Sequence, residues 1–436
     1  MVRILQFAYE PHDKTWRNLL FVNRYFRDVT CQASHLWTAV DMESNPRCHL
    51  ERSASRGLFV HADVSQDDVR FDRWIDALNP HVERWEYFLV ATNGVPGGID
   101  DSHSLEYQRL QLLRDFFRGR TFPTLESLCV IYESDMGMDL EADEDSDEDS
   151  DEIIVFDNER DPSASIRSFF SSWNMPALRS ISARGFIPIL PQSCLVNLTR
   201  LNLELGDLWR SHFHIHSLRD LIDTLRGLTA LESMALSLFS LREFVEDRVP
   251  PVELARLRFL SVESERCESD ALDALFDAFS APNIRELFLR GSVDSSDLED
   301  TLTNILLPDE GPCFKHLEKL TYCVTTFDDR NEYALEDLFR RIPQAVQHLT
   351  ICGWMQPQSS VSEMYDDFDG FPPSLRTLRF VHCLFDTFYI LNSSIFKLVN
   401  HPNFETLELQ GCPLINAKFL REVMPGIGKK LTYIHE

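Results

Sequence analysis

The chain has 436 residues, of which 44% are hydrophobic and 26% are charged, and its formal net charge is −28. This composition can bury a large core, while the acidic excess argues against nucleic-acid binding, which needs Lys and Arg to replace the counterions of phosphate. No run approaches the roughly 18 apolar residues that span a bilayer, and no secretory leader follows Met1, so we expect no membrane contact and a cytoplasmic or nuclear location.

The amino-terminal residues predict a small helical segment over residues 1–62. We expect one helix that breaks around residues 31–34, after which Leu36 and Trp37 lead into the alternating stretch AVDM. Residues 58–62 alternate again, as in a strand. On these residues alone the segment is an end cap, which a repeat array needs to cover its open core. The apolar stripe of the expected helix consists of Trp16, Leu19, Leu20, Val22, Phe26 and Val29.

A strongly acidic run follows the first part of the chain. The sequence EADEDSDEDSDE, residues 141–152, holds nine acidic residues and no large apolar residue. Such a segment cannot bury enough apolar surface to fold, so it predicts a disordered loop over about residues 134–163. The alternative is that this loop docks a basic partner.

A repeated pattern occupies most of the remaining chain. The template L-x-x-L-x-L occurs eleven times, and its last three intervals are 29 residues each. The fourth and sixth positions alternate as in a strand, and the linking residues 218–225, 272–279 and 335–342 have helical spacing. The template copies begin at Val82, Leu125, Leu178, Leu198, Leu231, Leu257, Ile284, Leu317, Val346, Leu375 and Phe404.

This alternation of strand and helix resembles the leucine-rich repeat family. The resemblance implies an α/β fold: a leucine-rich repeat solenoid, a horseshoe of parallel strands with outer helices, covering residues 63–436 in about eleven irregular units. Cys383 and Cys412 stand where that family favours Asn or Cys, as a small buried donor at the exit of the strand.

Positions three, five and seven of each template point to the open face of the predicted sheet. Their mixture of charges, hydroxyls and two phenylalanines is typical of an adaptable protein interface and not of a phosphate groove. The alternative for each residue is a plain solvent-exposed sheet face. We expect a protein substrate to contact Phe259, Glu286, Phe288, Arg290, Lys319, His348 and Arg379, with the two phenylalanines as the main anchors.

Catalytic and metal-binding motifs are not found in the sequence. There is no GxxxxGK[ST], GxSxG or HExxH motif, and the ten cysteines never form CxxC. His212, His214 and His216 would lie about 6.8 Å apart on an extended strand, too far for one metal ion unless the segment bends. We therefore expect reduced thiols, no cofactor, no metal and no enzymatic activity.

Three short stretches of the amino-terminal segment resemble the F-box proteins of fungi. The stretches are VNRYFRDV from Val22, SHLWTAVD from Ser34 and LERS from Leu50. The family has V-C-R-x-W-R-x-I, S-x-x-L-W-x-x-x-D and L-x-R-S in the same order, before a leucine-rich array. The opening L-P-x-E of the family is absent here, so MVRILQFA would be only the end of the first F-box helix.

The F-box resemblance implies an adaptor without chemistry of its own. The F-box binds the Skp subunit of a cullin ubiquitin ligase, and the repeat face binds a protein substrate. The missing start of the motif predicts weakened Skp binding, and the alternative function is a leucine-rich scaffold whose degenerate F-box is only an end cap. The Skp contacts carried over are Leu19, Leu20, Val22, Phe26, Leu36 and Trp37, with the alternative that several of them form the core of the small domain.

Overall fold

The computed structural model describes part of the chain, and every structural statement below concerns that part. The described residues are 19–64, 71–93, 105–133, 169–185, 187–205, 218–239, 250–265, 267, 269–292, 314–324, 339, 342–353, 372–384, 394–423, 426 and 429–434. They belong to two compact units, Met1–Glu204 and Leu205–Glu436. The acidic run 141–152, with the expected loop 134–163, and the histidines of residues 212–216 lie outside the described residues.

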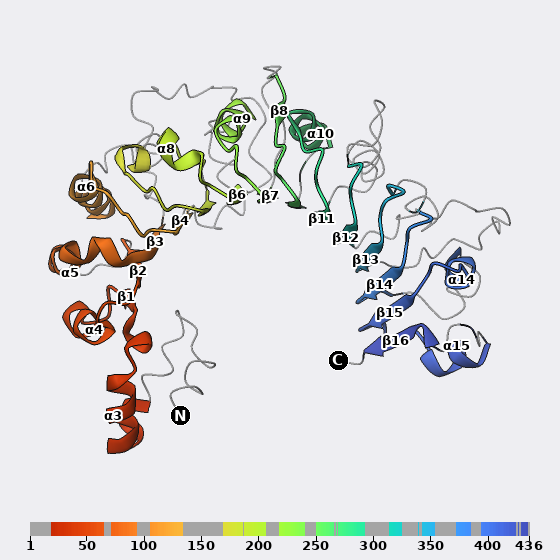
Figure 1. The fold of residues 1–436 in the computed structure, drawn as a ribbon, viewed down its shortest axis with the longest axis horizontal. Helices are drawn as coiled ribbons and strands as arrows, with labels where there is room; N and C mark the ends of the chain where they lie inside the picture. The colour runs from red at the N-terminus through yellow and green to blue at the C-terminus, as the bar shows by residue number, and fades with distance from the viewer. Residues whose placement is uncertain are drawn as a thin grey trace, which may run out of the picture. The chain divides into compact units, whose positions relative to one another are not determined.

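The first unit consists of parallel strands in chain order with helices between them (Figure 1). Its strands are β1 (Ala39–Asp41), β2 (Leu58–Asp63), β3 (Trp85–Asn93), β4 (Ser127–Glu133), β5 (Ser180–Arg184) and β6 (Arg200–Leu205). Its α-helices are α2 (Leu19–Val22), α3 (Arg24–Gln32), α4 (Pro46–Ser53), α5 (Phe71–Leu78), α6 (Leu105–Phe117) and α8 (Gln192–Leu195). Its described residues also form the short 3-10 helices η2 (Ser34–Trp37), η3 (Asn79–Arg84) and η5 (Phe169–Ser172).

The second unit has the same organisation, with its helices on one side of the strands (Figure 1). Its main strands are β7 (Ser233–Phe239), β9 (Phe259–Glu265), β11 (Glu286–Ser292), β12 (Lys319–Val324), β13 (His348–Cys352), β14 (Thr377–Val381), β15 (Thr406–Gln410) and β16 (Leu431–Ile434). Its helices are α9 (Leu218–Arg226), α10 (Ser269–Asp277), α14 (Ser394–Val399) and α15 (Ala417–Val423). The short strands β8 (Val252–Glu253) and β10 (Phe279–Ser280) pair separately.

The predicted α/β class is confirmed by fourteen parallel strands in the described part of the chain. Each of the eleven template copies contains a strand, which begins two residues after the first template position in ten copies and three residues after it in the copy from Val82. The template forms a strand with one buried face because its first, fourth and sixth positions are apolar and face inward. In one copy these residues are Leu257, Leu260 and Val262, which are at most 4% exposed. Helix α9 was expected at its observed place, whereas Phe279, expected at the end of a helix, lies in β10.

Turns next to the strands connect neighbouring repeats through side chains. Asn283, in the turn before β11, donates a hydrogen bond to the carbonyl of Ala255 at 2.7 Å. Asn403, before β15, donates to the carbonyl of Pro373 at 3.2 Å. Because these amides satisfy carbonyls of the preceding turn, they hold successive strands in register at their starts.

Buried thiols also connect neighbouring repeats, just after the carboxyl ends of three strands. Each thiol donates to a carbonyl of the preceding strand: Cys267 to Leu238 at 3.4 Å, Cys383 to Ile351 at 3.5 Å and Cys412 to Phe380 at 3.8 Å. The buried donors predicted at Cys383 and Cys412 are confirmed. Cys267 was not predicted, because β9 has seven residues and the cysteine therefore comes two positions later than after β14 and β15, which have five.

Candidate protein-binding surfaces

The open side of the strands in the second unit presents alternate side chains to solvent. Along β9 to β15 the even template positions are buried, and the odd positions are partly buried or exposed. The helices of this unit lie on the other side of the strands (Figure 1). We call the odd-position side chains of β9, β11, β12, β13, β14 and β15 the strand face.

The parallel register arranges the strand face into three rows that cross the strands. The first row is Phe259, Glu286, Lys319, His348, Thr377 and Thr406. The second row is Ser261, Phe288, Thr321, Thr350, Arg379 and Glu408. The third row is Glu263, Arg290, Cys323, Cys352, Val381 and Gln410.

All seven residues expected to contact a substrate lie on the strand face. Phe259, Glu286, Lys319 and His348 follow one another directly in the first row. Adjacent strands are about 4.8 Å apart, so these four side chains span roughly 15 Å of continuous surface. The structure thus brings together residues that are up to 89 positions apart in the chain.

The two phenylalanines of the strand face are placed diagonally on neighbouring strands. Phe259 is directly opposite Glu286, and Phe288 is directly opposite Ser261. Both rings are partly buried, so each keeps part of its surface in contact with its own chain. A partner would therefore bury only the remaining outer part of each ring.

Oppositely charged side chains pair across the strands of this face. The ammonium of Lys319 lies 2.7 Å from a carboxylate oxygen of Glu286. This hydrogen bond raises the pKa of Lys319. Both side chains are about half exposed (53% and 45%), so solvent screens the pair and its members can exchange partners with a ligand.

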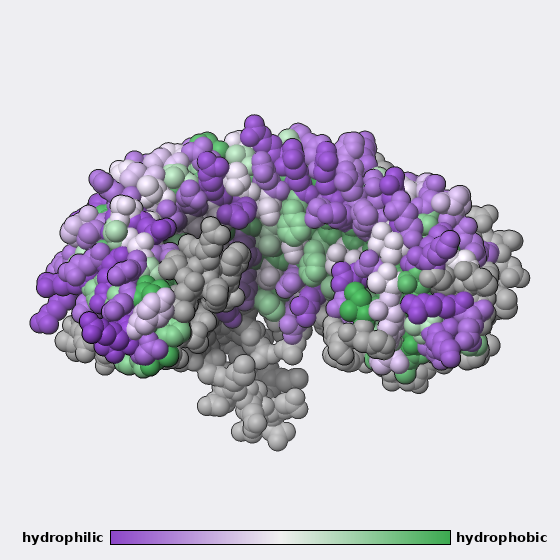
Figure 2. Space-filling model, turned by 60° about the horizontal axis from the view of Figure 1, so that its bottom comes forward, coloured by the Kyte–Doolittle hydropathy of each residue, from purple (hydrophilic) through white to green (hydrophobic). Residues whose placement is uncertain are grey.

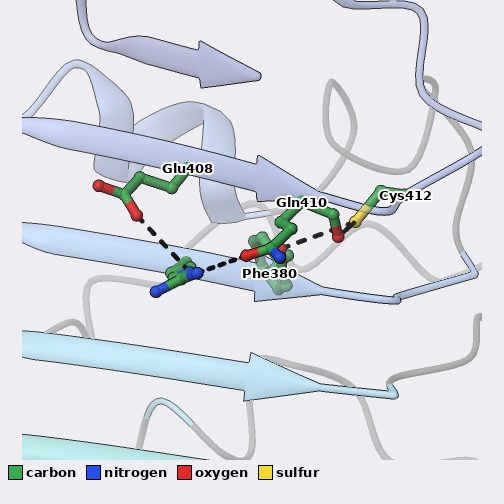
Figure 3. Close-up of polar contacts among 5 residues, drawn as sticks. Phe380, Glu408, Gln410 and Cys412 are labelled. Atoms are coloured by element: carbon green, nitrogen blue, oxygen red, sulfur yellow. Dashed lines mark hydrogen bonds and ion pairs between the residues drawn. The ribbon is translucent and has the colours of Figure 1, made fainter. Parts of the chain in front are cut away.

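Arg379 is held by two neighbours on the next strand that the sequence did not single out. Its guanidinium lies 3.7 Å from a carboxylate oxygen of Glu408 and donates a hydrogen bond to the side chain of Gln410 (Figure 3). Glu408 and Gln410 occupy the fifth and seventh template positions of β15. Both residues were expected on the open face because of these positions, although not among the substrate contacts. They lie next to Arg379 because odd positions of adjacent strands meet across the register.

On the face that Figure 2 shows, the described surface is mostly hydrophilic, with hydrophobic areas between charged and polar side chains. In the described part of the chain, no group of three or more His, Cys, Asp and Glu side chains is placed to hold a metal ion. The strand face itself combines charged, hydroxyl and partly buried aromatic side chains.

The amino-terminal segment does not contain the single helix expected from its apolar stripe. Asn23 is extended, with φ −165° and ψ 176°, and separates α2 from α3. Its side-chain oxygen accepts a hydrogen bond from the N–H of Phe26 at 3.0 Å. Asn is among the best N-caps because it satisfies an N–H that the first turn leaves unpaired, so it starts a new helix inside the apolar pattern.

Leu36 and Trp37, two of the expected Skp contacts, lie in the core of the chain itself. They are 0% and 4% exposed. The indole N–H of Trp37 donates to the carbonyl of Thr30 at 2.9 Å, and the guanidinium of Arg52 lies 4.2 Å from the ring centroid. These two side chains therefore stabilise the segment and are not available for direct contact with a partner.

The remaining expected contacts are nearer the surface. Val22 is 58% exposed, and Phe26 is partly buried. The backbone of Leu19 and Leu20 is helical, and their side chains lie outside the described residues. Sequence reasoning missed Phe21 and Tyr25, which are 82% and 61% exposed. Their large exposed apolar area is the signal for a contact surface, and only the structure reveals it.

No described helix has both the length and the apolar composition needed to cross a membrane. The chain matches no family model, and no curated protein is significantly similar to it in sequence.

Proposed function

We propose that the chain is a non-catalytic adaptor that recognises substrates for a ubiquitin ligase of the Skp, cullin and F-box type. In this proposal residues 1–62 are an F-box-like segment that binds the Skp subunit. Residues 63–436 are a leucine-rich repeat solenoid that binds a protein substrate on the strand face. The protein belongs in the cytoplasm or the nucleus, where such ligases act.

The observation that carries the proposal is that two different kinds of surface lie in two different compact units. The first unit exposes Phe21, Val22 and Tyr25 on its amino-terminal helices. The second unit presents the mixed rows of the strand face. One partner on each surface is what an adaptor requires, and the order of residues in VNRYFRDV, SHLWTAVD and LERS supports Skp as the first partner.

The adaptor would act by proximity alone. Holding a substrate and a ubiquitin-charged enzyme in one complex raises the effective concentration of a substrate lysine near the reactive thioester. No catalytic side chain is needed for this effect. The phenylalanines and the exchangeable Lys319–Glu286 pair would give the strand face its affinity and its selectivity.

The burial of Leu36 and Trp37 changes which residues we assign to the Skp contact. We assign direct contact to Phe21, Val22 and Tyr25, because truncating exposed aromatic side chains at an interface costs the most binding energy. Leu36 and Trp37 support them by packing beneath α3.

The test is binding of the full chain to a purified Skp subunit, measured by co-purification and calorimetry. The double substitution Phe21→Asp with Tyr25→Asp should weaken binding by at least about tenfold, since it places two charges in an apolar contact. Leu414→Asp is the matched control, because Leu414 is an exposed apolar residue of the second unit (57%). It should bind Skp like the wild type.

Absence of Skp binding by the wild-type chain would refute the adaptor proposal. The alternative function would then apply: a scaffold for protein interactions in which residues 1–62 only cap the repeats. A specific observation favours this alternative, because β1 pairs with β2 and β2 with β3 in parallel register. The amino-terminal segment thus extends the strand ladder, as a cap would.

A further inference from the structure

Two partly buried thiols face each other across neighbouring strands of the second unit. Cys323 of β12 is the direct partner of Cys352 of β13 in the parallel register. Both thiols are free, and both belong to the third row of the strand face. Neighbouring strands are about 4.8 Å apart, which lies within the roughly 4.4–6.8 Å between Cα atoms that a disulfide spans.

The other cysteines of the register offer no equivalent pair on an open face. Cys383 and Cys412 are fully buried, and their thiols donate to strand carbonyls. Cys129 of β4 is as partly buried as Cys323, but its register partners are Leu89 and Ser182. Cys129 is therefore a natural internal control for a single thiol on a strand.

Charged side chains around the pair favour a thiolate on Cys352. The hydrogen bond with Cys323, helped by the nearby guanidinium groups of Arg379 and Arg290, lowers the pKa of Cys352. The same hydrogen bond, together with burial, raises the pKa of Cys323. Glu263 lies opposite Arg290 and also disfavours a thiolate on Cys323. Cys352 is thus the better nucleophile of the two.

We propose that Cys323 and Cys352 form a thiol–disulfide exchange site whose co-reactant is a small disulfide that carries carboxylates. Arg290, directly opposite Cys323 on β11 and exposed to solvent, would attract such an anion. The site goes beyond the adaptor proposal and does not depend on it.

The reaction has two balanced steps. The thiolate of Cys352 attacks one sulfur of the co-reactant, and the other sulfur leaves with the electron pair of the broken S–S bond and takes up the proton that Cys352 has lost. Cys323 then loses its proton and attacks the sulfur of Cys352, which releases the second half of the co-reactant as a thiol. The protein gives up two electrons and two protons, and one small disulfide becomes two thiols.

Oxidised glutathione is the probe for this site, because it is a small disulfide that carries carboxylates. The reduced full-length chain is incubated with it, remaining thiols are alkylated, and the products are identified by mass spectrometry. We expect a peptide cross-linked through Cys323 and Cys352, with Cys129 alkylated. The variant Cys323→Ser should stop at a glutathione adduct on Cys352, whereas Cys129→Ser should still form the cross-link.

Two results would overturn the proposal. One is that Cys323 and Cys352 are alkylated to the same extent as Cys129 in the wild type. The other is that cross-links form elsewhere while these two thiols stay free. The charge preference has its own test: an uncharged disulfide, hydroxyethyl disulfide, should react several-fold more slowly at low salt, and Arg290→Gln should remove the difference. Equal rates in the wild type would rule out recognition of the carboxylates.

Discussion

From the sequence alone, Trp37 could be either an interface residue or a core residue. Its indole is 4% exposed, donates to Thr30 and packs edge-on against His49 with centroids 5.1 Å apart. A resemblance between sequences identifies the residue but does not say whether its ring faces a partner or its own chain. Burial decides the question, because a ring enclosed by its own domain cannot also be an interface anchor.

We therefore predict that Trp37→Ala lowers the free energy of unfolding of the first unit by about 3–5 kcal/mol, the usual cost of removing a buried aromatic ring. Denaturant titration followed by circular dichroism measures this loss. Phe21→Asp should leave the same titration almost unchanged, since Phe21 is 82% exposed. If Trp37→Ala unfolded at the wild-type denaturant concentration, the indole would not belong to the core.

At the scale of helices and strands, α3 depends on the cap that separates it from α2. The hydrogen bond from the N–H of Phe26 to Asn23 satisfies one of the unpaired donors of the first turn. The helix is only nine residues long, and short helices have little intrinsic stability to replace a lost cap. The position of the exposed Tyr25 therefore depends on Asn23.

Removing this cap should have a moderate and specific effect. Asn23→Ala is expected to destabilise the first unit by about 1 kcal/mol, whereas Asn23→Asp keeps an acceptor at the cap and should cost less. Thermal melting by circular dichroism compares the two variants. Identical melting of Asn23→Ala and the wild type would show that the cap does not contribute to stability.

The strands could be predicted from the sequence more fully than the amino-terminal helices. Template positions one, four and six are apolar in copy after copy, so both the strands and the outward side chains of the strand face follow from the pattern. The break at Asn23 does not follow, because the apolar stripe continues across it from Val22 to Phe26. The register that aligns Phe259 with Glu286 does follow from the pattern, because both residues stand at the third position of their template copies.

At the scale of the whole molecule, the net charge of −28 opposes folding. Like charges repel more strongly in the compact state than in the unfolded chain. Ion pairs in the described part of the chain, such as Arg285 with Glu318 at 3.4 Å and Arg376 with Glu405 at 3.5 Å, offset some of this repulsion locally. Dissolved salt screens the long-range part.

The melting temperature should consequently rise between about 10 mM and about 150 mM NaCl, where the Debye length falls from roughly 30 Å to 8 Å. Scanning calorimetry at constant pH measures the change. A variant in which the nine acidic residues of the run 141–152 are replaced by their amides should show a smaller rise. A melting temperature that falls with salt would mean that favourable ion pairs outweigh the repulsion.

The pairing of the parallel strands in chain order has consequences for folding and for evolution. Among β7, β9 and β11 to β16 of the second unit, each strand pairs with its neighbours in chain order, and successive strands begin as few as 25 residues apart, from Thr406 to Leu431. Contacts of this range allow folding to start at several places and to spread outward. Gain or loss of one whole repeat would leave the pairing of all the others intact, so the array can lengthen by duplication.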